Sequence, residues 1–399
     1  MRTVVFTLVS AATVAMALPV FAQDPIGWAQ LESPTSPVFE APSRKSRHVG
    51  SLRLGRPFPV FEYRDGKGCK EPWARVGPGW VCTQKVVAAD APIRPAEPEH
   101  YLPYKYATIF KDAEIHYKPG KRFGTGKMRK HKSTVSITAE EDRWVQTFPD
   151  QWIEKRQVVP RPPPDSSLEG VTLDAETVYP FALVRRGKIE AAPQPDLDKK
   201  ALRALSDDAL VPIKRFSRHP IEAVHPENSK WGPKWIKLPD GWVPKAAVAI
   251  VEPQARPDRV PDGDRWILVD LSEQLAVAYK GDTPVYATIV STGKPDARTP
   301  TGIWQVGAKH RSARMSGGSG ASYHFLADVP WIQYYSGGYA IHGAYWHNGF
   351  GWPRSQGCVN MHPRDAQWFF AFTEPRIPSG WHSFHIDRDT PSTWVVVVK

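Results

Sequence analysis

One cysteine near the C-terminus lies among residues that suit nucleophilic chemistry. Cys358 is part of the run SQGCVN at 355–360, and His342 lies upstream in the run IHG at 341–343. The attacking form of a cysteine is the thiolate, and a nearby histidine is the common means of generating it. Gly357 has no side chain, so backbone N–H groups beside the sulfur could point at a developing oxyanion. The pattern predicts acyl transfer, with Cys358 as nucleophile and His342 as base.

The cysteine count sets Cys358 apart. Of the three cysteines, Cys69 and Cys82 lie 13 residues apart in one tryptophan-rich segment, so a disulfide between these two is the simplest pairing. Cys358 then keeps a free thiol, for which the alternative to catalysis is a buried, inert side chain. A disulfide from Cys358 to either of the others would exclude the enzyme.

The N-terminus has the layout of an export signal. A basic residue precedes an apolar stretch at 4–20, and polar residues follow Ala22. We expect residues 1–22 to be a cleaved signal peptide; the alternative is a retained anchor, since the stretch is near the lower limit for spanning a bilayer. No later segment is long and apolar enough to cross a membrane. The chain is therefore expected to be exported, to the periplasm or cell envelope.

Composition indicates several small β-rich domains. The 399 residues include 40 prolines and 16 tryptophans, which favours short strands joined by turns over a helical bundle. The formal charge is +11. In an exported protein this charge makes an anionic envelope polymer a better partner than nucleic acid, although evenly spread solvated lysines would give the same total.

Three segments repeat a Trp-strand-turn-Trp pattern, at 73–81, 144–153 and 235–243. Proline or glycine at each turn predicts a β-hairpin, and the recurrence predicts one small β-barrel per copy. The segments resemble bacterial Src-homology-3-like (SH3b) modules, which we place at 28–90, 104–160 and 176–252. The resemblance implies cell-wall or peptide binding, with a spacer or packing role as the alternative. Proline clusters mark the joints between the modules.

The pattern changes at Asp264. Runs at 266–270, 274–279 and 284–290 predict a β-meander. A helix is expected after Pro363, with an apolar stripe of Ala366, Phe369 and Phe370.

Four motifs carry a second resemblance: STG at 291–293, TPTG at 299–302, IHG at 341–343 and SQGCVN at 355–360. Together they make residues 264–399 similar to the L,D-transpeptidase catalytic domain family (YkuD-type). The fold implied for the whole chain is mainly β, with tandem small β-barrel modules followed by an L,D-transpeptidase-like β-sandwich and a short helix.

The resemblance also implies roles for site residues. Cys358 is the nucleophile, His342 the base, and the Gly343 carbonyl orients that base; Ser355, Gly357 and Asn360 are loop or substrate contacts. The family has a histidine where this chain has Gln356. Glutamine forms hydrogen bonds but exchanges no proton near neutral pH, so Gln356 could hold the loop and indicates modified or narrowed activity.

Other residues near the motifs have two interpretations each. Tyr345 and Trp346 could line a groove for an extended peptide or pack in the core. Arg354 could bind the carboxylate of a diaminopimelate-containing stem or lie on the surface. Histidines at 310, 324, 347 and 362 show no metal-binding spacing, so no metal is expected, and the chemistry needs no cofactor.

The implied function is that of a peptidoglycan L,D-transpeptidase in cell-wall organisation. Cys358 would form a thioester with a tetrapeptide stem and release D-alanine, and a carbapenem would acylate it. The acceptor could be another stem's amine, giving a crosslink, or a lysine of an envelope protein, giving an anchor. With water the enzyme would be an L,D-carboxypeptidase. The alternative from a different class is a non-catalytic wall-binding protein.

Overall fold

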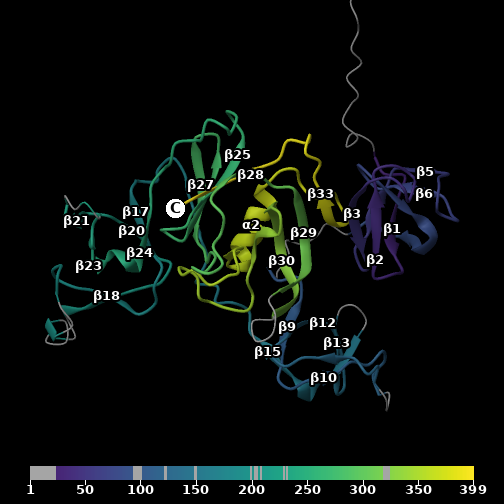
Figure 1. Ribbon diagram of the computed structural model, residues 1–399, viewed down its shortest axis with the longest axis horizontal. Helices are drawn as coiled ribbons and strands as arrows, with labels where there is room; N and C mark the ends of the chain where they lie inside the picture. Colours follow the sequence, from purple (N-terminus) through teal and green to yellow (C-terminus); the bar gives the residue numbers. More distant parts are fainter. Residues whose placement is uncertain are drawn as a thin grey trace, which may run out of the picture. The chain divides into compact units, whose positions relative to one another are not determined.

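The protein is mainly β and contains many short sheets (Figure 1). The computed structural model describes residues 24–92, 101–120, 124–147, 151–197, 200–201, 205–206, 209–227, 230, 232–317 and 324–399. The expected signal peptide at 1–22 lies outside these residues. Within them, no helix is long and apolar enough to cross a membrane. The chain divides into two compact units, of which the smaller holds most of residues 24–92.

The smaller unit is built from short antiparallel strands. In chain order they are β1 (Gly27–Leu31), β2 (Thr35–Phe39), β3 (His48–Arg53), β4 (Phe58–Val60), β5 (Glu62–Arg64), β6 (Trp73–Arg75), β7 (Trp80–Cys82) and β8 (Val86–Ala89), with the single-turn 3₁₀ helix η2 (Thr83–Lys85) before the last. Strands β4, β1 and β8 form one sheet, and β2, β7, β6 and β5 lie side by side in another. Trp73 and Trp80 are both buried.

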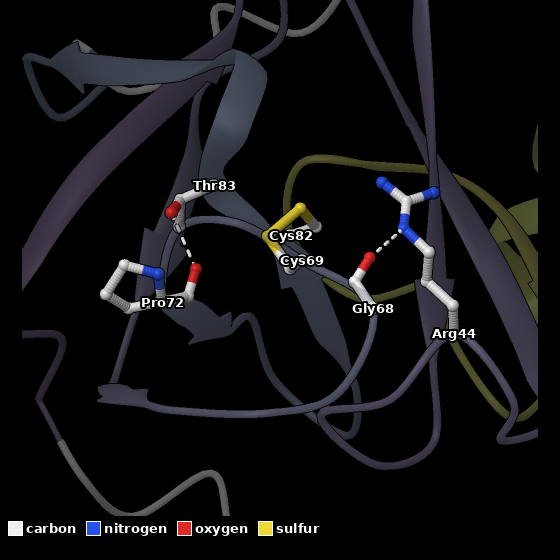
Figure 2. Close-up of a disulfide and its surroundings, with 6 residues drawn as sticks. All are labelled: Arg44, Gly68, Cys69, Pro72, Cys82 and Thr83. Atoms are coloured by element: carbon white, nitrogen blue, oxygen red, sulfur yellow. Dashed lines mark hydrogen bonds between the residues drawn. A yellow bond between two sulfur atoms is a disulfide. The ribbon is translucent and has the colours of Figure 1, made fainter.

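A disulfide joins Cys69 to Cys82 (Figure 2), the pairing expected from the sequence. It ties the loop before β6 to the end of β7. Two hydrogen bonds hold the same loop, from Thr83 Oγ1 to the Pro72 carbonyl at 2.6 Å and from Arg44 Nε to the Gly68 carbonyl at 2.5 Å. Cys358 is the only free cysteine among the described residues.

Replacing both bridged cysteines, Cys69→Ser with Cys82→Ser, is expected to destabilise the smaller unit by about 3 kcal/mol, because a crosslink across a loop of this size removes about that much unfolded-state entropy. Hydrogen exchange of the intact protein measures it: amides in 24–92 should exchange faster, while those in 264–399 serve as the internal control. Unchanged protection in 24–92 would show that the bridge contributes little.

The second segment forms one five-stranded antiparallel sheet, in the order β14-β13-β12-β9-β15. The elements of the segment are β9 (Lys105–Ile109), β10 (Ala113–Glu114), β11 (Met128–Arg129), β12 (Thr134–Glu141), β13 (Trp144–Thr147), β14 (Gln151–Glu154), η3 (Lys155–Gln157) and β15 (Val158–Arg161). Strands β10 and β11 form a separate two-stranded sheet. Alternate residues of the five-stranded sheet, including Ile109, Val135 and Val145, face a common core.

The third segment has three small sheets, in the orders β20-β17-β24, β18-β19 and β21-β22-β23. Its elements are β17 (Phe181–Val184), β18 (Ile189–Ala191), β19 (Val211–Ile213), β20 (Arg218–Pro220), β21 (Ala223–His225), β22 (Trp235–Leu238), β23 (Gly241–Pro244), η5 (Lys245–Ala247) and β24 (Val248–Val251). They enclose a core that includes Val184, Ile236 and Val243.

The three segments share one order of elements. Each predicted tryptophan hairpin is confirmed, as β6 with β7, β13 with β14 and β22 with β23. A 3₁₀ turn follows each hairpin, and the last strand then pairs with the first: β8 with β1, β15 with β9 and β24 with β17. The internal repeat predicted from the sequence is therefore a repeat of structure.

The C-terminal region contains two sheets and a helix (Figure 1). One sheet has the order β16-β27-β26-β25-β34-β28, and the other includes β32-β31-β30-β29-β33 as neighbours. The bounds are β16 (Val171–Thr172), β25 (Arg265–Asp270), β26 (Leu275–Lys280), β27 (Thr283–Ile289), β28 (Gly302–Gln305), β29 (Ala308–Gly317), β30 (His324–Ser336), β31 (Tyr339–Gly343), β32 (Val359–Met361), α2 (Pro363–Phe372), β33 (Trp381–His385) and β34 (Trp394–Val398). The predicted meander is confirmed as β25, β26 and β27.

Helix α2 begins at Pro363 and buries the predicted apolar stripe. His362 caps its N-terminus by accepting the Arg364 N–H. The helix packs in one core with residues of both sheets, among them Ile267 of β25 and Ile341 of β31. It therefore lies against the strand that carries His342.

Strand β16 comes from the chain between the second and third segments. It pairs with β27, so the sheet extends beyond the predicted start at Asp264. Leu168 and Leu173, on either side of it, belong to the same core as Trp266. The Gly170 N–H is donated to the Asp365 carboxylate at 2.9 Å.

Candidate active site

A parallel pair of short strands brings the two predicted reactive residues together. Strand β31 pairs with β32 so that Ile341 lies opposite Val359 and His342 lies opposite Asn360. Because side chains alternate along a strand, Ile341 and Val359 face the core around α2, and His342 and Asn360 face the other side. Cys358 directly precedes β32, two residues before Asn360.

Cys358 faces the same side of the sheet as His342. Its side chain packs in a cluster with Ala340, Val329 and Ile332 rather than in the core around α2. Because His342 lies opposite Asn360, Cys358 is two residues before the position that pairs with His342. The structure places the predicted base and nucleophile on one surface.

The His342 ring is held in a defined tautomer. Its Nδ1 lies 3.2 Å from the Gly343 carbonyl, which can only accept, so Nδ1 carries the proton. The side chain is 2% exposed, and burial lowers the pKa of His342 to about 4. The imidazole is therefore neutral at pH 7, and its Nε2 is available to accept a proton.

The Cys358 thiol is neutral in the resting protein. Burial raises the pKa of Cys358 above its ordinary value, and a hydrogen bond with the Ala340 backbone only partly offsets this. The Sγ donates a long hydrogen bond to the Gly338 carbonyl at 3.9 Å. Burial disfavours both ions of a thiolate–imidazolium pair, so the directions of the two pKa shifts favour a neutral thiol beside a neutral imidazole.

Alkylation of Cys358 by iodoacetamide is expected to accelerate about tenfold per pH unit from pH 7 to 9, because the reactive thiolate fraction grows with pH below a raised pKa. Mass spectrometry at several pH values measures the rate. A Cys358→Ala protein controls for other sites. A rate that already levels off near pH 7 would mean that the thiolate is the resting form.

Ser355 and Gly357 shape the loop before Cys358. The Ser355 hydroxyl accepts the Gly357 N–H at 3.0 Å and donates to the Cys358 carbonyl at 2.6 Å. Gly357 has φ of 111°, and a Cβ there would lie 2.4 Å from the Tyr339 ring. Only glycine fits this position. The side chain of Gln356, the departure from the family, is exposed on the same loop.

The STG and TPTG motifs form hydrogen bonds that hold this loop and the strand after it. Ser291 exchanges two backbone hydrogen bonds with Asn360, at 2.9 and 2.8 Å. The Thr292 carbonyl accepts the N–H groups of Arg354 and Ser355, at 2.8 and 3.0 Å. Thr299 Oγ1 accepts the Gly293 N–H at 2.9 Å, which joins the two motifs. The two motifs lie far from Cys358 in the sequence, and their contact with its loop becomes visible only in the fold.

Tyr345 packs in the interior, which agrees with the second of its two interpretations and not with a place in an open groove. It is 3% exposed, and its hydroxyl bonds the Ala327 carbonyl at 2.7 Å and Thr134 at 2.8 Å. Its ring stacks on Tyr106 at 3.6 Å. Thr134 and Tyr106 belong to the second segment. Tyr345 therefore connects that segment to the C-terminal region through a hydrogen bond and a ring stack.

Asn360 is also turned inward. It is buried, and its side-chain amide bonds Nε2 of His347 at 3.1 Å, so it fixes a second histidine rather than facing solvent. Burial lowers the pKa of His347 to about 4. The sequence analysis considered His347 only as a metal ligand and gave it no place beside the nucleophile. Trp346 is half-buried with its ring 5.7 Å from that of His342, so it remains a candidate for substrate contact.

Metal ligation receives no support from the geometry. Within the described ranges, no group of three or more His, Cys, Asp or Glu side chains is arranged to hold a metal ion. Arg354, the predicted carboxylate binder, is exposed and lines a pocket with three other arginines.

Residues 264–397 match the family model of the L,D-transpeptidase catalytic domain, YkuD. The match covers about a third of the chain and gives the class of its C-terminal region as an L,D-transpeptidase catalytic domain. No curated protein matches the chain.

Several solved structures of L,D-transpeptidases are similar to parts of this chain. The Ldtfm–avibactam carbamoyl enzyme is 25% identical, with a TM-score of 0.28, over 34% of this chain and 49% of that one. A point mutant of the Enterococcus faecium L,D-transpeptidase is 24% identical, with a TM-score of 0.28, over 34% and 50%. Mycobacterium tuberculosis L,D-transpeptidase 3 is 17% identical, with a TM-score of 0.28, over 34% and 61%. The chain spans about half the length of the first two.

Proposed function

We propose that this protein is a cysteine acyltransferase that acts as an L,D-transpeptidase on peptidoglycan stem peptides. The family match of residues 264–397 supports the class. The observation that carries the mechanism is the neutral His342, whose proton lies on Nδ1, on the same sheet face as Cys358. Such a pair can activate a thiol at the moment of attack.

In the first half-reaction, Cys358 Sγ attacks the carbonyl carbon of the third residue of a tetrapeptide stem. His342 Nε2 takes the thiol proton and then gives it to the nitrogen of the departing D-alanine. The products are a thioester and free D-alanine. The Gly357 N–H is already donated to Ser355, so we assign oxyanion stabilisation to the backbone of Cys358 itself.

In the second half-reaction, a nucleophile attacks the thioester carbonyl, and the thiolate leaves and regains its proton through His342. An amine of another stem gives a crosslink, and a lysine of an envelope protein gives an anchored protein. Water gives an L,D-carboxypeptidase. None of these routes needs a cofactor.

The three repeated segments supply the binding part of this proposal. As SH3b-like modules at 28–90, 104–160 and 176–252, they would hold the enzyme on the cell wall. Their shared hairpin, 3₁₀ turn and closing strand support one common origin and role. Residues 1–22 would direct export to the periplasm or cell envelope.

Incubation with a defined disaccharide-tetrapeptide, with and without an added amine acceptor, tests the proposal. Mass spectrometry should show loss of D-alanine and a new amide to the acceptor. Release of the tripeptide alone, with the acceptor ignored, would assign the enzyme as a carboxypeptidase. An unchanged substrate, together with co-sedimentation of the protein with insoluble peptidoglycan, would leave only the wall-binding alternative.

A further inference from the structure

Four arginines line one pocket beside the loop that leads to Cys358. The pocket has a volume of about 300 Å³. Arg185, Arg186 and Arg215 come from the third segment, and Arg354 comes from the loop between β31 and β32. The remaining lining residues are glycines, Asn348 and Trp352, so none of the described residues that line the pocket is acidic.

Two of the arginines hold neighbouring backbone segments through hydrogen bonds. Arg185 donates to the carbonyls of Ser272 and Glu273, at 3.2 and 3.0 Å. Arg215 donates to the carbonyls of Asn348 and Phe350, at 2.8 and 2.7 Å. Backbone carbonyls satisfy these guanidinium groups without neutralising them, so both positive charges remain at the pocket.

The other two arginines are placed to meet a ligand. The Arg186 guanidinium lies 4.2 Å from the centre of the Trp352 ring, which is 42% exposed and forms an aromatic wall. The buried Nε of Arg186 has no hydrogen-bond partner among the described residues. Arg354 is exposed across the same pocket.

The acidic groups near the pocket do not cancel its charge. Glu273 lies close to Arg185 but is paired with Lys245, whose Nζ is 2.7 Å from its carboxylate. Asp270 acts on Arg185 and Asp165 acts on Arg215, but neither carboxylate is among the residues that line the pocket. A concave site with this excess of positive charge concentrates anions, and guanidinium groups bind carboxylate and phosphate through paired hydrogen bonds.

We propose that this pocket binds an oxyanion, a carboxylate or phosphate group of an envelope polymer, at a place distinct from the carbonyl that Cys358 attacks. Ser291 forms hydrogen bonds both to the pocket wall and to the strand that follows Cys358. The Ser291 hydroxyl bonds the carbonyls of Gly349 and Trp352 in the pocket wall, while its backbone pairs with Asn360 of β32. An anion bound here would position the polymer beside the thiol, but its binding does not depend on acyl transfer.

Isothermal titration of the full chain with inorganic phosphate and with citrate, at matched ionic strength in chloride, tests this. We expect saturable binding that weakens at least about tenfold in a protein with Arg186→Gln and Arg354→Gln, because each arginine supplies a charge-assisted hydrogen bond. These two are chosen because Arg185 and Arg215 brace the backbone. A preference for phosphate or citrate identifies the kind of anion.

Arg388→Gln is the matched control, since this arginine is exposed and lies outside the pocket. It should bind as the unaltered protein does. Cys358→Ala should also bind normally, which separates this proposal from the proposed reaction. Absence of saturable binding to both anions, or equal binding by the double variant and the control, would overturn it.

Discussion

Cys358→Ala protein is expected to form no covalent adduct with a carbapenem, whereas the unaltered protein gains the mass of one drug molecule. The reason is that the described residues contain no other free thiol, and the remaining cysteines form a disulfide. Turnover of a tetrapeptide stem should fall by at least about 10³-fold, since removal of a nucleophile leaves only binding and electrostatic effects. Intact-protein mass spectrometry and product analysis measure the two effects.

Cys358→Ser is the informative partner of this variant, because it keeps the shape of the buried side chain and changes only the nucleophile. Thermal unfolding of both variants checks that the fold persists. An adduct on Cys358→Ala would mean that another residue carries the acyl group, and the mechanism would have to be reassigned.

The second large effect is expected from His342→Gln, which should slow acylation by about 10²- to 10⁴-fold, the contribution typical of a positioned general base. Glutamine can still bond the Gly343 carbonyl, but it cannot take the thiol proton. Stopped-flow measurement of carbapenem acylation gives the rate. In the unaltered protein the acylation rate should decrease only as pH falls toward about 4, where His342 becomes protonated.

Gln356→His is a suitable companion, since the family has histidine there and the side chain is exposed. It should leave the acid limb of the pH profile unchanged, because that limb belongs to the buried His342. An unaltered acylation rate in the His342→Gln protein would contradict the general-base assignment, regardless of the result for Gln356→His.

Local patterns in the sequence were enough to predict much of this fold. Each tryptophan hairpin and the helix at Pro363 depend on residues close together in the chain, such as turn glycines and prolines. The pairing of Cys69 with Cys82 is local in the same way. Cys358 and His342 were found because each lies in its own short motif.

Properties that depend on distant parts of the chain were missed. The pKa of Cys358 is raised by burial, and burial is decided by strands that the local motif does not contain. The sequence left open whether Tyr345 lines a groove or packs in the core, because its partners, Tyr106 and Thr134, lie in another segment. The arginine pocket likewise draws on two regions that are far apart in sequence.

The edge strand β16 affects where the C-terminal region can be cut to make a stable fragment. A fragment that starts at Asp264 would lack Val171 and Thr172, and so would leave the backbone of β27 open at the rim of its sheet. It would also uncover the apolar surface under Leu168 and Leu173. A fragment meant to keep this sheet covered should therefore include residues 165–173, and the same core also contains Phe181 and Leu183 of β17.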